Sequence, residues 1–298
     1  MSTCIEPNVP RRVTLRTLVK MAKRGEPFAC LAAYDATMAR WLDRAGVHVL
    51  LAGDSGSQLA LGYERTIDMP LDYAIQITAA LRRGALNALV MADMPFMSYQ
   101  ADDADALRNA ARFMTEGLAD VVKVEVDGSH ADLVAKMTRA GVPICAHIGL
   151  RPQNVGLQGG YRAVGRTAEE ACALLADARA LQDAGAVLLL LEAVPDPVAA
   201  AIVEESRVPV IGIGAGSAPH GQILVAHDLL GLTDTPPRFA QPFAELGPAI
   251  RDAASKWVSR VSDRALPTDA YTMPDDEAAR FARLRSKVPE PDRQRAED

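Results

Sequence analysis

The sequence predicts a closed barrel of alternating strands and helices, the (β/α)8 TIM-barrel class of α/β folds. Short apolar runs recur along the chain, and amphipathic segments with apolar residues at three-to-four spacing separate them. A glycine follows several of these segments, just before the next apolar run. Nearly continuous apolar runs are typical of strands buried on both faces, so the alternation indicates parallel strands with right-handed crossovers. A doubly wound open sheet is the alternative.

Each apolar run marks one predicted strand. Seven strands are expected at 28–33, 47–52, 87–92, 121–125, 143–147, 187–191 and 208–213, and a weaker eighth near 238–240, after a helix-like stretch at 220–230. Helices are expected at 36–45, 101–116, 131–140, 168–184 and 196–206. Seven or eight such units within roughly 230 residues fit the size of a (β/α)8 barrel.

The predicted barrel forms a single domain over residues 1–265. Residues 1–27 precede the first strand and are expected to supply a helix that caps the barrel, and 241–265 have the pattern of a final helical region. The C-terminal extension, 266–298, becomes highly charged after 275, which predicts a frayed helix or disorder there.

Composition excludes several classes of partner. The 298 residues are 49% hydrophobic, carry a formal net charge of -6, and contain neither a long Lys/Arg run nor an apolar run of the roughly 18 residues that cross a bilayer. We therefore expect no nucleic-acid and no membrane partner. The N-terminus lacks the apolar core of a signal peptide, and four scattered cysteines indicate a reducing compartment. A cytoplasmic location is predicted.

Titratable side chains end consecutive predicted strands, where a (β/α)8 barrel carries its active site. They are Asp54 after the second strand, Asp93 after the third, Lys123 and Glu125 on one face of the fourth, His147 on the fifth and Glu192 after the sixth. Each has a structural alternative. The aspartates could be helix caps or turn residues, and Lys123 and Glu125 could form a structural ion pair. His147 could be a core histidine, and Glu192 could be an acid that simply ends a strand.

The combination points to metal-assisted enolate chemistry. Asp54, Asp93 and Glu125 form an all-oxygen ligand set of the kind that suits Mg²⁺. A nearby lysine and a separate glutamate base suggest that the metal chelates a 2-oxo acid and stabilises its enolate. Glu192 is a plausible base because burial at the rim would raise its pKa.

Several stretches together resemble the ketopantoate hydroxymethyltransferase family. The matching stretches are AAYDATMARWLDRAGVHVLLAGDS (32–55), LGYERT (61–66), RRGALNALVMADMPFMSYQ (82–100), ADVVKVE (119–125), VPICAHIGLRPQNVGLQGGYRAVGRT (142–167), LEAVP (191–195) and IGIGAG with GQILVAHDLLGL (211–232). The resemblance implies a barrel of the phosphoenolpyruvate/pyruvate type, Mg²⁺, and 5,10-methylenetetrahydrofolate as the one-carbon donor to 3-methyl-2-oxobutanoate. It also implies the first committed step of pantothenate synthesis, and a homo-oligomer that is decameric in many members.

The resemblance also implies a role for each matching residue. Asp54 and Asp93 bind Mg²⁺ and contact the substrate, Glu125 is the third acid, bound directly or through water, and Ser55 and Lys123 contact the 2-oxo acid. Glu192 accepts the proton from C3, and His147 hydrogen-bonds the substrate or a neighbouring site residue.

The chain departs from the family pattern at Gly56, Ile77, Ala193 and His220, positions that we expect on the substrate and folate side. The alternative function is a folate-independent carbon–carbon lyase, or a hydroxymethyltransferase for a different 2-oxo acid.

Overall fold

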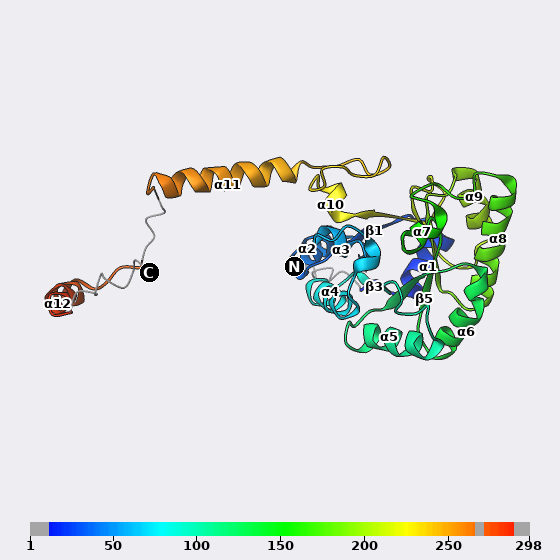
Figure 1. Ribbon diagram of the computed structural model, residues 1–298, viewed down its shortest axis with the longest axis horizontal. Coiled ribbons are helices and arrows are strands. Elements are labelled where there is room, and N and C mark those ends of the chain that lie inside the picture. Colours follow the sequence, from blue (N-terminus) through cyan, green and yellow to red (C-terminus); the bar gives the residue numbers. More distant parts are fainter. Residues whose placement is uncertain (1–11, 266–270, 289–298) are drawn as a thin grey trace, which may run out of the picture. The chain divides into compact units, whose positions relative to one another are not determined.

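The computed structural model, which describes residues 12–265 and 271–288, contains a closed barrel of parallel strands (Figure 1). The strands are β1 (Phe28–Ala32), β2 (Val49–Ala52), β3 (Leu89–Asp93), β4 (Val121–Glu125), β5 (Ile144–Gly149), β6 (Leu188–Glu192), β7 (Val210–Ile213) and β8 (Gly221–Val225). They pair in sequence order, and β8 pairs with β1 to close the ring. The closure confirms the predicted barrel and excludes the open sheet.

Helices surround the barrel and connect its strands. They are α1 (Leu15–Lys23), α2 (Ala36–Arg44), α3 (Gly56–Leu59), α4 (Leu71–Gly84), α5 (Asp103–Thr115), α6 (Ala131–Arg139), α7 (Val155–Gln158), α8 (Ala168–Asp183), α9 (Asp196–Glu205) and α10 (Ala226–Leu229). Short 3-10 turns lie at Thr66–Asp68, Gly128–His130 and Pro152–Asn154. The five predicted helices agree with α2, α5, α6, α8 and α9 to within two residues at each end.

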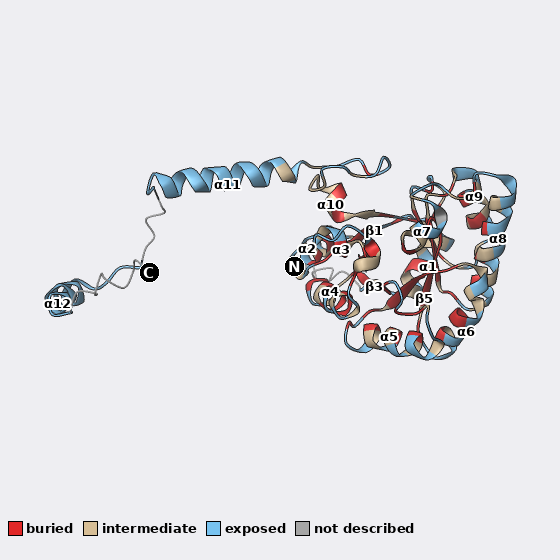
Figure 2. Ribbon diagram, in the orientation of Figure 1, coloured by how far each residue is buried: buried red, intermediate tan, exposed pale blue. Residues whose placement is uncertain are grey.

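Alternation along each strand sends every second side chain into the barrel. One buried cluster collects the inward residues, such as Leu89 and Met91 on β3 and Val121 on β4. A second cluster collects the outward residues that pack beneath the helices, such as Val90 and Val122. Figure 2 shows the strands and the inner faces of the helices as buried. At the carboxyl ends of the strands, the next inward-facing positions are occupied by polar residues.

A helix before the first strand closes one end of the barrel, as predicted. Thr14 caps α1 through a reciprocal hydrogen-bonded box with Thr17. Leu18 of α1 is fully buried, in the same cluster as Phe28 and Val49 at the amino ends of β1 and β2. The remainder of the predicted cap, residues 1–11, lies outside the described residues.

The predicted eighth strand was wrong. Residues 238 and 239 form a turn, and β8 lies instead at Gly221–Val225, within the stretch predicted as helix-like. The apolar residues of 220–230 mimic helical spacing because a strand and the short helix α10 follow one another without a break. Pairing of β8 with β1 decides the local structure, and Gly221 is required there because any Cβ would collide with the Phe28 ring.

The chain divides into two compact units, Met1–Leu246 and Gly247–Asp298. This division falls before the expected domain boundary at residue 265. The second unit contains most of α11 (Leu246–Ser262) and all of α12 (Asp275–Arg285), and neither helix has a buried residue (Figure 2). The end of the charged extension, 289–298, lies outside the described residues. None of the described helices is long and apolar enough to cross a membrane.

Candidate active site

A cavity of about 540 Å³ opens at the carboxyl ends of the barrel strands. Its lining includes all seven residues predicted for the site: Asp54, Ser55, Asp93, Lys123, Glu125, His147 and Glu192. Most of these side chains converge because every second residue of β3 to β6 faces the barrel interior. The residues at the carboxyl ends of these strands that follow this alternation are Asp93, Lys123, Glu125, His147 and Glu192. The structure thus places the predicted groups in one site.

A buried ion pair joins β3 to β4 within the cavity. The Lys123 ammonium donates to Asp93 Oδ1 at 2.6 Å, and its Nζ lies 4.0 Å from Glu125 Oε1. The backbone N–H of Asp54 donates to the other Asp93 oxygen at 3.2 Å. Burial disfavours the ammonium, but the surrounding carboxylates outweigh burial and raise the pKa of Lys123. Lys123 therefore stays positively charged in the cavity.

The carboxyl groups around Lys123 are buried, and burial disfavours their ionised forms. Burial raises the pKa of Asp93, and the Lys123 ammonium offsets only part of that rise. Burial also raises the pKa of Glu125 well above its usual value. Three acids share this wall with a single ammonium, so added positive charge would stabilise their ionised forms.

Gln153 connects the acids, and the sequence analysis missed it. Its side-chain amide donates to Asp54 Oδ2 at 3.0 Å and to the Met94 carbonyl at 2.9 Å, and its backbone N–H donates to Glu125 Oε2 at 2.9 Å. The Gln153 side-chain oxygen lies 3.0 Å from the Tyr99 hydroxyl. The only sequence signal was a polar pair, Gln153-Asn154, that begins six residues after the end of the predicted fifth strand.

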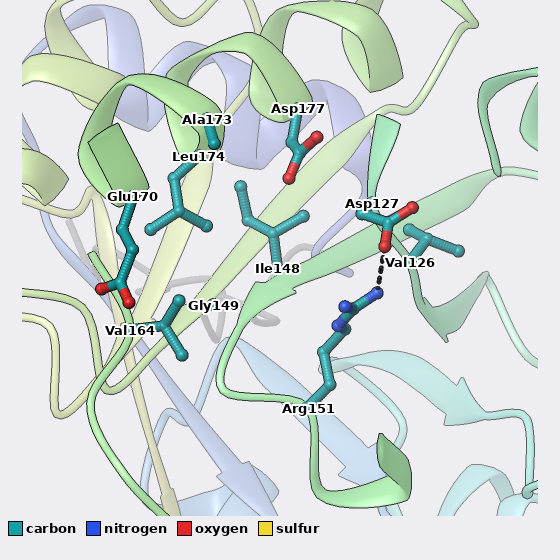
Figure 3. A pocket seen from close by; sticks show the side chains of 10 residues that line it. All are labelled: Val126, Asp127, Ile148, Gly149, Arg151, Val164, Glu170, Ala173, Leu174 and Asp177. Carbon is teal, nitrogen blue, oxygen red and sulfur yellow. Dashed lines mark hydrogen bonds and ion pairs between the residues drawn. The ribbon is translucent and has the colours of Figure 1, made fainter. Parts of the chain in front are cut away.

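An ion pair on the outer side of the barrel holds the segment that carries Gln153. Arg151 donates to Asp127 at 2.7 Å, beside a separate small cavity of about 160 Å³ (Figure 3). Burial opposes ionisation of Asp127, but hydrogen bonds from Ser129, His130 and Arg151 outweigh it and hold the pKa of Asp127 below its usual range. Arg151 thus fixes the segment from outside while Gln153 fixes it from inside.

His147 lies between Glu125 and Glu192. Its Nδ1 is 3.7 Å from Glu125 Oε1, and its Nε2 is 3.4 Å from Glu192 Oε2. Burial lowers the pKa of His147 well below its usual value, so the imidazole is neutral at pH 7 and these contacts are not ion pairs. Within the described residues, neither ring nitrogen has a hydrogen-bond partner. His147 therefore keeps unused hydrogen-bonding capacity beside the cavity.

Glu192 has the properties of a general base. It ends β6, its side chain is 18% exposed, and it lines the cavity. Burial raises the pKa of Glu192 to about 7, with the charge of Lys123 opposing that rise. Ala193 follows with a φ of 49°, an uncommon conformation for a residue other than glycine, and its N–H donates to the Ile213 carbonyl. This conformation turns the chain immediately after the carboxylate.

The predicted departures from the family pattern do not line the cavity. Ile77 is buried in the core between the helices and strands, and His220 accepts a hydrogen bond from the Val210 N–H at the amino ends of β7 and β8. Gly56 lies beside Tyr34, where a Cβ would approach the ring to 2.8 Å. The expectation that the departures lie on the substrate and folate side is therefore wrong for Ile77 and His220, whereas Gly56 and Ala193 directly follow the lining residues Ser55 and Glu192.

The donor set fits a hard cation that shares its coordination with substrate and water. Its oxygen donors are the carboxylates of Asp54, Asp93 and Glu125, and Glu125 Oε1 is buried without a hydrogen-bond partner in the described part of the chain. Across the described residues, no three His, Cys, Asp or Glu side chains form a ready-made metal cage. Mg²⁺ is commonly held by one or two carboxylates with waters and substrate oxygens completing its shell.

Comparisons with known proteins find one family over most of the chain. The family model described as ketopantoate hydroxymethyltransferase matches residues 12–269. The chain is 46% identical over 253 residues to the 3-methyl-2-oxobutanoate hydroxymethyltransferase of Geobacillus kaustophilus, covering 85% of this chain and 91% of that protein. It is 44% identical over 264 residues to the enzyme of the same name from Thermobifida fusca, covering 88% and 94%.

Solved structures share the fold at low sequence identity. A phosphonomutase-like protein from Burkholderia cenocepacia superposes with a TM-score of 0.58 at 20% identity, covering 84% of this chain and 99% of that one. A 2,3-dimethylmalate lyase, described as a member of the PEP mutase/isocitrate lyase superfamily, superposes with a TM-score of 0.56 at 18% identity, covering 92% and 96%. These likenesses show that the chain shares the barrel fold of these proteins.

Proposed function

The chain belongs to the ketopantoate hydroxymethyltransferase family, whose members act in pantothenate biosynthesis, and from this premise we propose how its cavity performs hydroxymethyl transfer. The substrate is 3-methyl-2-oxobutanoate, and 5,10-methylenetetrahydrofolate supplies the one-carbon unit. The observation that carries the proposal is the placement of Glu192 in the same cavity as the Lys123–Asp93 pair. One group can remove a proton while the other holds the 2-oxo acid.

The side chains of β2, β3 and β4 bind the acid. The charged Lys123 attracts the substrate carboxylate and 2-oxo oxygen, and the Ser55 hydroxyl, 2.9 Å from the Tyr34 hydroxyl, is a further hydrogen-bond donor. Asp54 and Asp93 would hold Mg²⁺, with Glu125 bound to it directly or through water. When bound, Mg²⁺ supplies positive charge that polarises the 2-oxo group and so acidifies C3.

Proton removal falls to Glu192. Its carboxylate takes the proton from C3 of the 2-oxo acid, and the neutral His147 lies beside it to hydrogen-bond the substrate. The resulting carbanion equivalent forms a bond to the methylene carbon, both bonds from that carbon to the two folate nitrogens break, and water supplies the hydroxyl group. The C3 proton and the second proton of water end on the two nitrogens. The products are 2-dehydropantoate and tetrahydrofolate, which balances the reaction.

A substrate panel tests this function. The protein is incubated with Mg²⁺ and a series of 2-oxo acids, with and without 5,10-methylenetetrahydrofolate, and products are identified by mass spectrometry. We expect 2-dehydropantoate from 3-methyl-2-oxobutanoate only when the folate is present. Turnover that does not depend on the folate would favour the alternative, a folate-independent carbon–carbon lyase or a transferase for a different 2-oxo acid.

The activity should rise with pH through about 7. Since the pKa of Glu192 is raised to about 7, its carboxylate is protonated and inactive below that pH. We expect kcat/KM to increase about tenfold per pH unit below 7 and to level off above it. Initial rates between pH 5.5 and 8.5 measure this profile, and Tm at each pH shows that the fold persists. A rate independent of pH across this range would assign the proton removal to another group.

Gln153→Leu should lower activity by impairing the placement of the acids. The variant removes the amide that holds Asp54, and neighbours of metal ligands typically contribute about 10- to 100-fold to metal affinity or activity. We expect the Mg²⁺ concentration that gives half-maximal rate to rise by about that factor. Gln100→Leu is the matched control, because Gln100 donates to the Gln153 oxygen and contacts no acid. An equal loss in both variants would indicate a structural effect only.

Two further expectations, the oligomer from the resemblance and the location from the composition, complete the proposal. The protein is a homo-oligomer, which sedimentation of the full chain measures, and it acts in the cytoplasm on small molecules.

A further inference from the structure

The cavity is larger than the 2-oxo acid requires. Its volume of about 540 Å³ falls within the roughly 300–1,000 Å³ of pockets that enclose drug-sized ligands, whereas 3-methyl-2-oxobutanoate is a five-carbon acid. The groups proposed to bind that acid come from β2 to β6. The wall formed by β8 and the segment after it has no role in the steps described above.

An unsatisfied polar group lies on this second wall. Within the described residues, buried side-chain atoms without a hydrogen-bond partner occur in only two places. Glu125 and His147 belong to the wall already described, and the other two atoms are His227 Nδ1 and Thr233 Oγ1. Thr233 also lines the cavity. His227 is not part of the lining, and its ring lies against Tyr34. Buried polar atoms are normally paired, so the unpaired Thr233 hydroxyl points to a missing ligand at this wall.

Asp228 is the central polar group of this wall. Its side chain lines the cavity and the residue is only 6% exposed. No described residue donates a hydrogen bond to its carboxylate or forms an ion pair with it, although its backbone carbonyl accepts from Gly231. A carboxylate this deeply buried needs donors. The arrangement leaves that role to whatever occupies the cavity.

The 2-oxo acid cannot satisfy Asp228. It is an anion whose oxygens all accept hydrogen bonds, so a carboxylate repels it. A ligand with adjacent N–H groups would instead form charge-assisted hydrogen bonds to both carboxylate oxygens. The cavity lining also includes apolar and aromatic side chains, among them Leu224, Ile213, Phe239 and Tyr161. A flat heterocycle with an amino group next to a ring N–H fits both features.

We propose that Asp228 binds the amino-pyrimidinone edge of the pterin ring of the one-carbon donor. The 2-amino group and the adjacent ring N–H donate to the two Asp228 oxygens, Thr233 Oγ1 is available to a further polar atom of the ring, and the apolar lining contacts the ring face. This assignment rests on the proposed function, because the folate is the co-substrate proposed there. It places the donor on the β8 wall and the acceptor on the β3–β4 wall of one cavity.

Calorimetric titration with tetrahydrofolate, in the presence of Mg²⁺ and 3-methyl-2-oxobutanoate, tests the assignment. Asp228→Asn replaces one accepting oxygen by a donor, and we expect its Kd for tetrahydrofolate to rise about 10- to 100-fold. The KM for the 2-oxo acid should stay unchanged. Asp35→Asn is the matched control, because Asp35 lies outside the cavity lining and caps α2, a role that asparagine fills equally well. It should bind tetrahydrofolate as the unaltered chain does.

A second measurement needs no variant. The 2-desamino analogue of tetrahydrofolate lacks one of the two proposed donors, so the unaltered chain should bind it about 10- to 100-fold more weakly than tetrahydrofolate. Asp228→Asn should discriminate far less between the two ligands. Equal affinity of the unaltered chain for both would overturn the assignment.

The remaining outcomes are distinguishable. Unchanged tetrahydrofolate binding in Asp228→Asn, with or without a fall in kcat, would overturn the pterin assignment and leave the proposed function standing. If kcat alone fell, Asp228 would act on the product hydroxyl or on water. Failure of the unaltered chain to bind tetrahydrofolate, together with folate-independent turnover, would overturn both the assignment and the proposed function.

Discussion

Glu192→Gln is expected to lower kcat by about 10²- to 10⁴-fold, the usual contribution of a positioned general base. Glutamine has nearly the same shape as glutamate but cannot accept the C3 proton. Glu192 is the last residue of β6, and its side chain forms no hydrogen bond with the described residues. Its Oε2 lies 3.4 Å from His147 Nε2. We therefore expect Tm and the affinity for 3-methyl-2-oxobutanoate to change little. Steady-state formation of 2-dehydropantoate measures the loss.

Glu192→Asp is the informative partner variant. It keeps the carboxylate but withdraws it by one methylene, so we expect an intermediate rate and a retained dependence on pH. A kcat for Glu192→Gln within a few-fold of the unaltered chain would show that another group removes the proton.

The second large effect is expected for Asp93→Asn. Asp93 accepts from the Lys123 ammonium at 2.6 Å and from the Asp54 N–H, and it is proposed to bind Mg²⁺. Losing a preorganised charged group of this kind typically lowers kcat by about 10²- to 10³-fold. Titration of the rate with Mg²⁺ should show a response shifted to much higher concentration or lost.

The same variant should also lower stability. Breaking a buried ion pair leaves an uncompensated charge and commonly costs about 3–5 kcal/mol of unfolding free energy, although Glu125, 4.0 Å from Lys123, will offset part of that. The double variant Asp93→Asn with Lys123→Met removes both charges. We expect it to recover most of the lost Tm and none of the activity. Recovery of activity along with Tm would restore the reading of this pair as purely structural.

Much of the site could be predicted because its residues follow the two-residue alternation of side chains along a strand. Lys123 and Glu125 lie two apart, and the structure sends both into the barrel with Val121. Asp93 and Glu192 end apolar runs in which every second residue, counted back from the acid, faces the barrel interior. The carboxyl ends of parallel strands meet in one place, so residues far apart in the chain converge without any information beyond the fold.

The remaining contacts depend on tertiary structure that the local pattern does not contain. Gln153 lies in a turn, and its role depends on a segment folding back over β4 so that its amide reaches Asp54. Asp228 follows β8, the strand that the pattern misplaced because its apolar residues continue into a helix. The pairing of β8 with β1 positions the wall that carries Asp228. These two strands are far apart in the chain, so a local sequence pattern does not reveal their pairing.

The most direct test of the account is exchange of the C3 hydrogen of 3-methyl-2-oxobutanoate in heavy water, followed by proton NMR. The account places proton removal on Glu192, with the acid held by Lys123, Asp93 and Mg²⁺. The unaltered chain should catalyse exchange when Mg²⁺ is present, and Glu192→Gln, with its Tm and substrate affinity retained, should not. Exchange at the unaltered rate in Glu192→Gln would contradict the account.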